Sequence, residues 1–304
     1  MEPFRVHILG CGSALPTLRH YPSAQVVELR EKLFMVDCGE GTQLQLRRLR
    51  VRFTKVSHVF ISHLHGDHCF GLIGMISTFG LLGRTARLHI HAHPALEDML
   101  QRQMALYCRD LGYEVVFHTI DASCREVIYE DRSLTVETIP LSHRMPTCGF
   151  LFREKPLLPH IRREMIDFYK IPTSQIQNIK NGADWTTDDG ELIPNARLVE
   201  PADAPRSYAY CSDTRYLPDL HQQLQGVSTL YHESTYGEDN LKMAEKYYHS
   251  TARQAAMVAR DAGAGQLILG HYSSRYEDEQ VLLNEARQVF ANARLANELE
   301  VINV

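Results

Sequence analysis

The chain alternates short apolar runs with longer segments in which apolar residues recur every three or four positions. Eight of the short runs are rich in Val, Ile, Leu, Phe and Tyr, a pattern that predicts buried β-strands. They are Arg5–Leu9, Leu33–Val36, His58–Ser62, Leu88–His91, Leu134–Ile139, Ser207–Cys211, Thr229–Tyr231 and Gln266–Leu269. Strands first cluster with turns and later alternate with helices, so we expect an α/β fold of packed sheets with helices outside them.

Helical spacing predicts the elements between these strands. Alanines at helical spacing begin at Ala252, directly after a Thr251-x-x-Gln254 capping box, so a helix is expected to start there. Two further helices are predicted over Ala95–Cys108 and Val281–Ala296, and Phe70–Leu82 is also helix-like.

The stretch 155–205 is the least regular part of the chain. It contains six prolines and two glycines around a short helical patch at Ile161–Tyr169. We therefore expect a single domain over 1–304 with an inserted arm at 155–205, where substrate-binding elements are common. From composition alone, an ordinary surface excursion remains an equal alternative.

Composition narrows the class of protein. At 304 residues, with 44% apolar and 23% charged residues, the chain is average for a globular protein. We expect a cytoplasmic protein without a membrane segment, since the sequence shows no signal-peptide pattern and no run of about 20 apolar residues. The seven cysteines are scattered and never spaced C-x-x-C, which argues against a disulfide framework or a thiolate zinc site.

The formal charge of −5 is not typical of a nucleic-acid-binding domain. Two local groups of basic residues, between Arg47 and Lys55 and between Arg153 and Lys180, run against this overall balance. Each is either a binding patch or ordinary solvated surface.

Histidine is the unusual residue, with 16 copies. The run Ser-His-Leu-His-Gly-Asp-His at 62–68 places three imidazoles and a carboxylate directly after a predicted strand, a poor pattern for packing and a good one for metal. Gly66 permits the bend between the first pair, His63 and His65, and the second pair, Asp67 and His68. Two metal ions side by side are therefore predicted. By contrast, His89, His91 and His93 alternate without a carboxylate, and we interpret them as strand and strand-end residues.

A two-metal site needs ligands from elsewhere in the chain. Three later strand ends offer them: His143, Asp213 and His271 each lie just past an apolar run. Imidazole and carboxylate ligands suit two Zn²⁺ ions, although Mn²⁺ or Fe²⁺ fits the same set.

The H-x-H-x-D-H run resembles the signature of metallo-β-lactamase-fold hydrolases, and other motifs resemble the ribonuclease Z branch of that superfamily. These motifs are Leu9–Thr17, Asp37–Gln43, Leu141–Phe150, Ser212–Arg215, His232–Tyr236, His249–Ala252 and His271–Tyr276, in the family's order and across nearly the whole chain. The resemblance implies an αββα sandwich. It also implies that His63, His65 and His143 bind one metal, that Asp67, His68 and His271 bind the other, and that Asp213 bridges them.

The implied activity is endonucleolytic removal of 3′ trailers from precursor tRNA. Hydroxide held between the two cations would attack phosphorus, with Asp67 orienting it or accepting its proton. His249 is the candidate donor of a proton to the leaving 3′ oxygen, and Glu233 is the candidate that orients His249. Thr251, Ser273 and Arg275 are candidate phosphate contacts, and each could equally serve as a cap or an ion-pair partner.

The resemblance also implies a homodimer and an arm that grips tRNA through a Gly-Pro element. The matching segment here, Ile171–Lys180, lacks that pair. Two alternatives to the nuclease stay open: another hydrolase of this fold, such as a small phosphodiesterase, an arylsulfatase-like enzyme or a thioesterase, and a non-catalytic metal-stabilised RNA-binding protein.

Overall fold

The computed structural model describes residues 3–304, which form two compact units. The inserted unit is Glu154–Pro205, and the main unit comprises the chain up to Arg153 together with Arg206–Val304. Each unit is described by itself.

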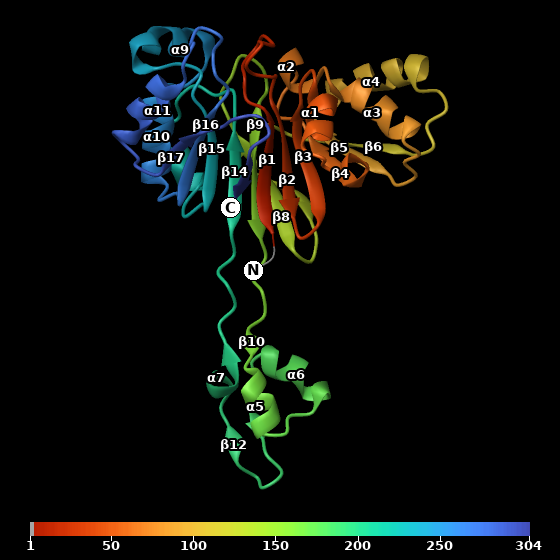
Figure 1. The fold of residues 1–304 in the computed structure, drawn as a ribbon, viewed down its shortest axis with the longest axis vertical. Helices are drawn as coiled ribbons and strands as arrows, with labels where there is room; N and C mark the ends of the chain where they lie inside the picture. Colours follow the sequence, from red (N-terminus) through yellow and green to blue (C-terminus); the bar gives the residue numbers. More distant parts are fainter. Residues whose placement is uncertain (1–2) are drawn as a thin grey trace. The chain divides into compact units, whose positions relative to one another are not determined.

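The main unit contains two seven-stranded sheets (Figure 1). The first has the order β18-β1-β2-β3-β4-β5-β6, formed by β1 (Phe4–Gly10), β2 (Ala24–Leu29), β3 (Lys32–Cys38), β4 (Val56–Phe60), β5 (Leu88–Ala92), β6 (Val115–Thr119) and β18 (Val301–Asn303). The second has the order β17-β16-β15-β14-β9-β8-β7, formed by β7 (Val127–Glu130), β8 (Leu134–Pro140), β9 (Cys148–Glu154), β14 (Ser207–Cys211), β15 (Thr229–Glu233), β16 (Gln266–Gly270) and β17 (Ala293–Leu295).

Helices cover the outer faces of the two sheets (Figure 1). Beside the first sheet lie α1 (Thr42–Arg48), the 3₁₀ turn η1 (Phe53–Lys55), α2 (Gly66–Cys69), α3 (Leu72–Leu81) and α4 (Pro94–Tyr107). Beside the second lie α8 (Leu220–Gln223), η2 (Glu238–Asn240), α9 (Leu241–Tyr247), α10 (Ala252–Asp261) and α11 (Gln280–Arg287). The expected αββα sandwich is confirmed.

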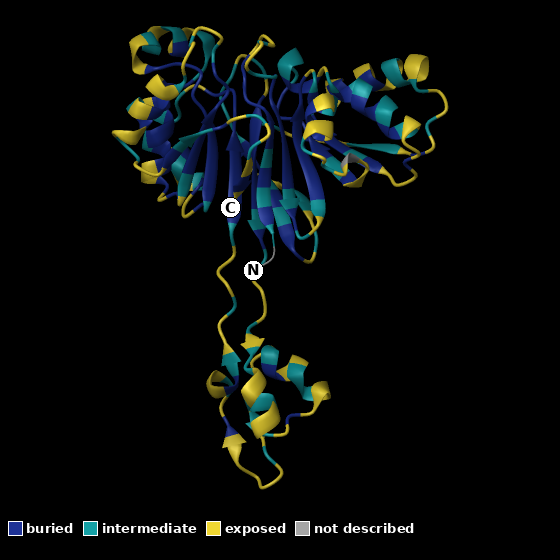
Figure 2. Ribbon diagram, viewed as in Figure 1, coloured by how far each residue is buried: buried dark blue, intermediate teal, exposed yellow. Residues whose placement is uncertain are grey.

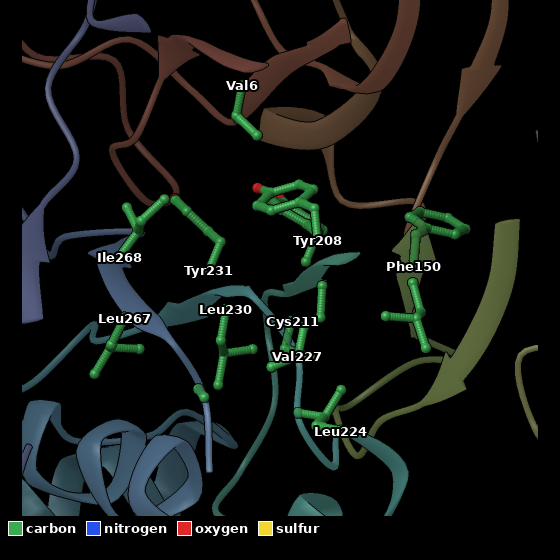
Figure 3. Close-up of a cluster of buried hydrophobic side chains, with 14 of the residues drawn as sticks. Val6, Phe150, Tyr208, Cys211, Leu224, Val227, Leu230, Tyr231, Leu267 and Ile268 are labelled. Carbon is green, nitrogen blue, oxygen red and sulfur yellow. The ribbon is translucent and has the colours of Figure 1, made fainter. Parts of the chain in front are cut away.

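Alternation along the strands explains why the sheets pack face to face. On β3, Phe34 and Val36 join the core between the sheets, whereas Leu33 and Met35 join the core beneath α1 and α3. On β15, Tyr231 points toward the first sheet and Leu230 points the other way (Figure 3). The central strands are therefore buried on both faces, and most exposed residues of the main unit lie on its helices, loops and edge strands (Figure 2).

The inserted unit has a small hydrophobic cluster of its own. Its elements are β10 (His160–Ile161), α5 (Arg163–Phe168), α6 (Thr173–Lys180), β11 (Trp185–Thr186), β12 (Leu192–Ile193), α7 (Asn195–Leu198) and β13 (Val199–Glu200). Ile171, Ile179, Ile193 and Leu198 are buried at its centre. Such a core, together with the two short antiparallel pairs β10–β13 and β11–β12, distinguishes this segment from an irregular loop.

Most predicted elements have counterparts in the structure. All eight predicted strands coincide with observed ones, although His58–Ser62 runs two residues past the end of β4. The helix predicted over Val281–Ala296 is wrong beyond Arg287: α11 ends there, and 293–295 form β17, which pairs with β16. Sequence reasoning missed several strands, among them β2, β6, β7 and β9.

Two simple absences hold across the described residues. All seven cysteines are free thiols, as their spacing predicted. In residues 3–304, no helix has the length and apolar character needed to cross a bilayer.

Candidate metal centre and active site

The predicted metal ligands meet at one edge of the sandwich because each follows the end of a strand. The run 62–68 follows β4, and His143 follows β8. Asp213 and His271 follow β14 and β16, which lie in a parallel array with β15 between them, so the carboxyl ends of these strands share one edge. The structure thus brings together side chains that are up to 208 positions apart, from His63 to His271.

The seven side chains form two groups whose potential ligand atoms lie within 4.8 Å of one another. One group contains His63, His65, His143 and Asp213, and the other contains Asp67, His68 and His271. Asp213 faces both: its Oδ2 lies 2.9 Å from His68 Nε2 and 3.1 Å from His271 Nε2, and its Oδ1 lies 3.8 Å from His143 Nε2. This is the arrangement that a bridging carboxylate requires.

Two buried nitrogens show that the site fits metal ions. Within residues 3–304, His68 Nε2 and His271 Nε2 are both buried and neither has a hydrogen-bond partner. Their short approach to the Asp213 carboxylate lacks hydrogen-bond geometry and suits a shared cation. Burial also lowers the pKa of His63, His65 and His143, which keeps these imidazoles neutral, as metal binding requires. Imidazole and carboxylate donors together suit zinc, manganese or iron(II).

The backbone is strained where the ligands are presented. Asp213 and His271 both have a φ of 59°, and Asp37 has a φ of 56°. Few residues other than glycine adopt this left-handed conformation, and aspartate and histidine are among those that tolerate it best. Such strain is typical of functional sites, and here it turns each side chain sharply at the end of its strand.

Asp37 holds His68 in place from behind. Its Oδ2 accepts hydrogen bonds from His68 Nδ1 at 2.7 Å, Tyr210 Oη at 2.8 Å and Ser62 Oγ at 2.9 Å, and its Oδ1 accepts one from Ser62 N at 2.8 Å. The carboxylate is fully buried. Because Nδ1 of His68 is engaged, its Nε2 is the atom presented to the metal group.

Three of the other imidazoles are fixed in the same way. His143 Nδ1 lies 2.9 Å from the carbonyl oxygen of Tyr248, and His63 Nδ1 lies 3.0 Å from Ser62 Oγ. Thr235 donates to Glu233 and lies 2.9 Å from His271 Nδ1. Asp67 Oδ2 accepts the amide of Ala14 at 2.7 Å. Each of these partners leaves one ligand atom directed into the site.

His249 and Glu233 form a pair beside the two metal groups. His249 Nδ1 lies 3.0 Å from Glu233 Oε1 and 3.8 Å from Asp213 Oδ1. Glu233 is fully buried and also accepts the amides of Thr214 and Ser250. Burial lowers the pKa of His249, but the charge and hydrogen bond of Glu233 outweigh burial and raise it to about 9. Glu233 therefore favours the protonated form of the His249 imidazole.

A cavity of about 580 Å³ opens over this site. Ser273 and Arg275 line it, as do Asp67, His143 and His249. Thr251 does not: it is fully buried, caps α10 by accepting from Gln254 N, and donates to Glu238. The candidate phosphate contact at Thr251 is therefore corrected to a helix cap. The two other candidates have access to a bound substrate.

Several site residues were not identified from the sequence. Asp37, Ser62 and Thr235 lie inside quoted motifs but were given no role, and Tyr210 was taken only as part of a strand. Arg144 also lines the cavity, with its guanidinium 4.9 Å from the ring of Tyr247. For Asp37, a signal existed in the sequence, since a carboxylate at the end of an apolar strand is costly unless it has partners.

Comparison with known proteins identifies the family. The chain is 57% identical over 304 residues to the ribonuclease Z of Phocaeicola vulgatus, covering 100% of this chain and 98% of that protein. It is 58% identical over 298 residues to the ribonuclease Z of Bacteroides fragilis, covering 98% of each. A family model described as anti-Pycsar protein Apyc1 matches residues 4–159.

Solved structures agree in fold. The short form of human tRNase Z superposes with a TM-score of 0.72 at 25% identity, covering 98% of both chains. The metallo-β-lactamase-fold protein YhfI of Bacillus subtilis superposes with a TM-score of 0.69 at 19% identity, covering 99% of this chain and 100% of that one, and shows the fold alone. With relatives this similar over its full length, the chain belongs to the ribonuclease Z family of metallo-β-lactamase-fold hydrolases.

Proposed function

We propose that this protein is a zinc-dependent endoribonuclease that removes 3′ trailers from precursor tRNA. The observation that carries the proposal is the position of the His249–Glu233 pair. A protonated imidazole lies within 3.8 Å of the carboxylate that joins the two metal groups, at the floor of an open cavity. A proton donor placed there serves a reaction in which a poor leaving group must depart, such as the 3′ oxygen of a phosphodiester.

Two zinc ions held by the seven ligands would supply positive charge for the phosphate oxygens and lower the pKa of water at the site. The chain's own residues then divide the remaining work. Asp67, whose pKa is lowered because His68 and His271 outweigh the effect of burial, stays ionised and orients the attacking water. Water adds to phosphorus and gives up a proton to Asp67, the bond from phosphorus to the 3′ oxygen breaks, and His249 gives that oxygen a proton. Ser273 and Arg275 contact the flanking phosphate.

The test is a His249→Gln variant, assayed with a 3′-extended precursor tRNA. We expect full zinc content and a turnover number lower by about 10²–10⁴-fold, the usual contribution of a general acid. Bis-p-nitrophenyl phosphate has a leaving group that needs no proton, so its hydrolysis should fall much less. Equal losses on both substrates would show that His249 does not act as the acid. Comparable efficiency of the wild-type enzyme on both substrates would favour a general phosphodiesterase instead.

The inserted unit is the proposed tRNA-gripping element. It has its own core and carries Arg162, Arg163, Lys170 and Lys180. Replacing residues 156–203 with a short Gly-Ser linker should leave hydrolysis of the small diester unchanged and raise KM for precursor tRNA. An unchanged KM would remove this segment from tRNA binding.

Two further proposals concern the protein in the cell. We infer a homodimer from the family, and a monomeric mass in light scattering at assay concentration would refute it. We also infer a cytoplasmic location, supported by seven free thiols in the described chain. Fractionation of cells that produce the protein would test this location.

A further inference from the structure

Four histidines gather on neighbouring strands of the first sheet, away from the metal centre. His58 on β4 is in register with His89 on β5, and His91 on β5 is in register with His118 on β6. Residues in register share a face of the sheet, as do positions two apart, so all four imidazoles lie on one face. None of them lines the cavity over the metal centre.

The rings form two stacked pairs that are joined by close nitrogen contacts. His58 stacks on His89 with ring centroids 4.6 Å apart, and His91 stacks on His118 at 4.4 Å. Across these stacks, His89 Nδ1 lies 2.9 Å from His118 Nε2, and His58 Nδ1 lies 3.0 Å from His91 Nε2. His118 is exposed and His89 is partly exposed, whereas His91 is only 2% exposed. The outer pair, His89 and His118, is therefore accessible, and the inner pair, His58 and His91, supports it.

The spacing of the outer pair matches that of two cis metal ligands. Two imidazole nitrogens bound at about 2.0–2.1 Å with a right angle between them lie about 2.9 Å apart. The same spacing, 2.9 Å, separates His63 Nε2 from His65 Nδ1 in the metal centre. Burial and the neighbouring His118 lower the pKa of His89, so this ring is neutral and its lone pair is available at neutral pH.

We propose that His89 and His118 form a second metal site, which binds one divalent late transition metal such as Ni²⁺ or Cu²⁺. The donors are imidazoles without a carboxylate or thiolate, a set that suits these ions and disfavours Mg²⁺ or Ca²⁺. His58 and His91 are positioning residues: their stacked rings fix the orientation of the two ligands. Water completes the coordination shell, because within the described chain no third histidine, cysteine or acidic ligand atom comes within 4.8 Å of both nitrogens.

The site is tested by titrating Ni²⁺ into the zinc-loaded, full-length enzyme and following the heat of binding. Ni²⁺ is the probe because it does not oxidise the seven free thiols. A His89→Gln/His118→Gln double variant should bind Ni²⁺ at least about tenfold more weakly than the wild type. The matched control, His160→Gln/His221→Gln, removes two histidines outside the quartet and should keep wild-type affinity.

Three results would overturn the proposal. One is wild-type Ni²⁺ affinity in the His89→Gln/His118→Gln variant, and another is an equal loss in the control. The third is release of one zinc for each Ni²⁺ taken up, which would place the probe in the metal centre. The single variant His118→Gln changes only an exposed side chain on the edge strand β6, so a loss of affinity there cannot come from unfolding. Unchanged zinc content and melting temperature in each variant confirm that the fold is intact.

Discussion

Replacing Glu233 with glutamine should move the alkaline limit of catalysis to lower pH. In the wild-type protein, Glu233 raises the pKa of His249 to about 9 against the opposing effect of burial. Without the carboxylate charge of Glu233, the pKa of His249 falls toward the ordinary histidine value of about 6.5. At pH 8, a group with pKa about 9 is about 90% protonated, and one with pKa about 6.5 is about 3% protonated. The turnover number should therefore fall at pH 8, by up to about thirtyfold.

The pH dependence of turnover distinguishes loss of the carboxylate charge from a general loss of structure. A general acid works in its protonated form, so the variant should recover toward wild-type turnover as the pH is lowered to 6. In the wild-type protein, the Glu233 carboxylate accepts hydrogen bonds from Thr214 N, Ser250 N, Thr235 Oγ1 and His249 Nδ1. The glutamine amide replaces one of these acceptor oxygens by a donor. A loss of stability of about 1–3 kcal/mol should accompany the change, because two donors then meet. That loss does not depend on the protonation of His249 and cannot produce the recovery.

The assay is single-turnover cleavage of precursor tRNA between pH 5.5 and 10, with zinc content measured at each pH. Glu238→Gln is the matched control, since Glu238 accepts from Thr251 and does not contact His249. Positive charge at the metal centre lowers the pKa of His249 in all three proteins. The difference between their profiles is therefore the quantity to compare. If the Glu233→Gln profile keeps the wild-type alkaline limit, Glu233 does not set the protonation of His249.

Four further substitutions test the surroundings of the site. Asp37→Asn should lower zinc affinity about 10–100-fold in competition with a chelator, because His68 loses the carboxylate that orients it; unchanged affinity would contradict this role. Thr251→Ala should cost about 1 kcal/mol of stability in urea and leave KM for tRNA unchanged, since its hydroxyl caps α10; a raised KM would instead support a phosphate contact. Phe152→Ala and Phe79→Ala should each cost about 3–5 kcal/mol as buried truncations. Phe152 lies between the two sheets, and Phe79 lies outside the first sheet. Phe152→Ala alone should therefore also weaken zinc binding in the folded protein. Equal weakening in Phe79→Ala would contradict this expectation.

Many of the strands and the seven candidate metal ligands could be picked out from the sequence because both leave local signals. A nearly continuous apolar run ends, and a histidine or aspartate follows, as at His143, Asp213 and His271. The supporting hydrogen bonds leave no such signal, since Asp37 and Tyr210 are 173 positions apart and meet only through the packing of two sheets. Their pairing depends on register and layer order, which local pattern does not encode.

The helix predicted across Val281–Ala296 failed for a related reason. Its apolar spacing continues past Arg287, so periodicity alone extends the helix. In the fold, the main chain of Asn292 accepts a hydrogen bond from Leu267, and the next residues pair with β16 as an edge strand. Pairing with β16 satisfies the backbone hydrogen-bonding groups of residues 293–295. This tertiary contribution outweighs the local preference for a helix.

The metal centre depends on both sheets at once. Asp37 belongs to β3 of the first sheet, and Tyr210, which donates to it, belongs to β14 of the second. His68 follows β4, the neighbour of β3 in the first sheet, and Asp213 follows β14 of the second. A small slip between the sheets would therefore separate the carboxylate from the imidazole it orients and both from their shared ions. Dense aromatic packing between the sheets, in which the ring centroids of Phe60 and Phe152 are 5.7 Å apart, prevents that slip. The packing thereby fixes the geometry on which the chemistry depends.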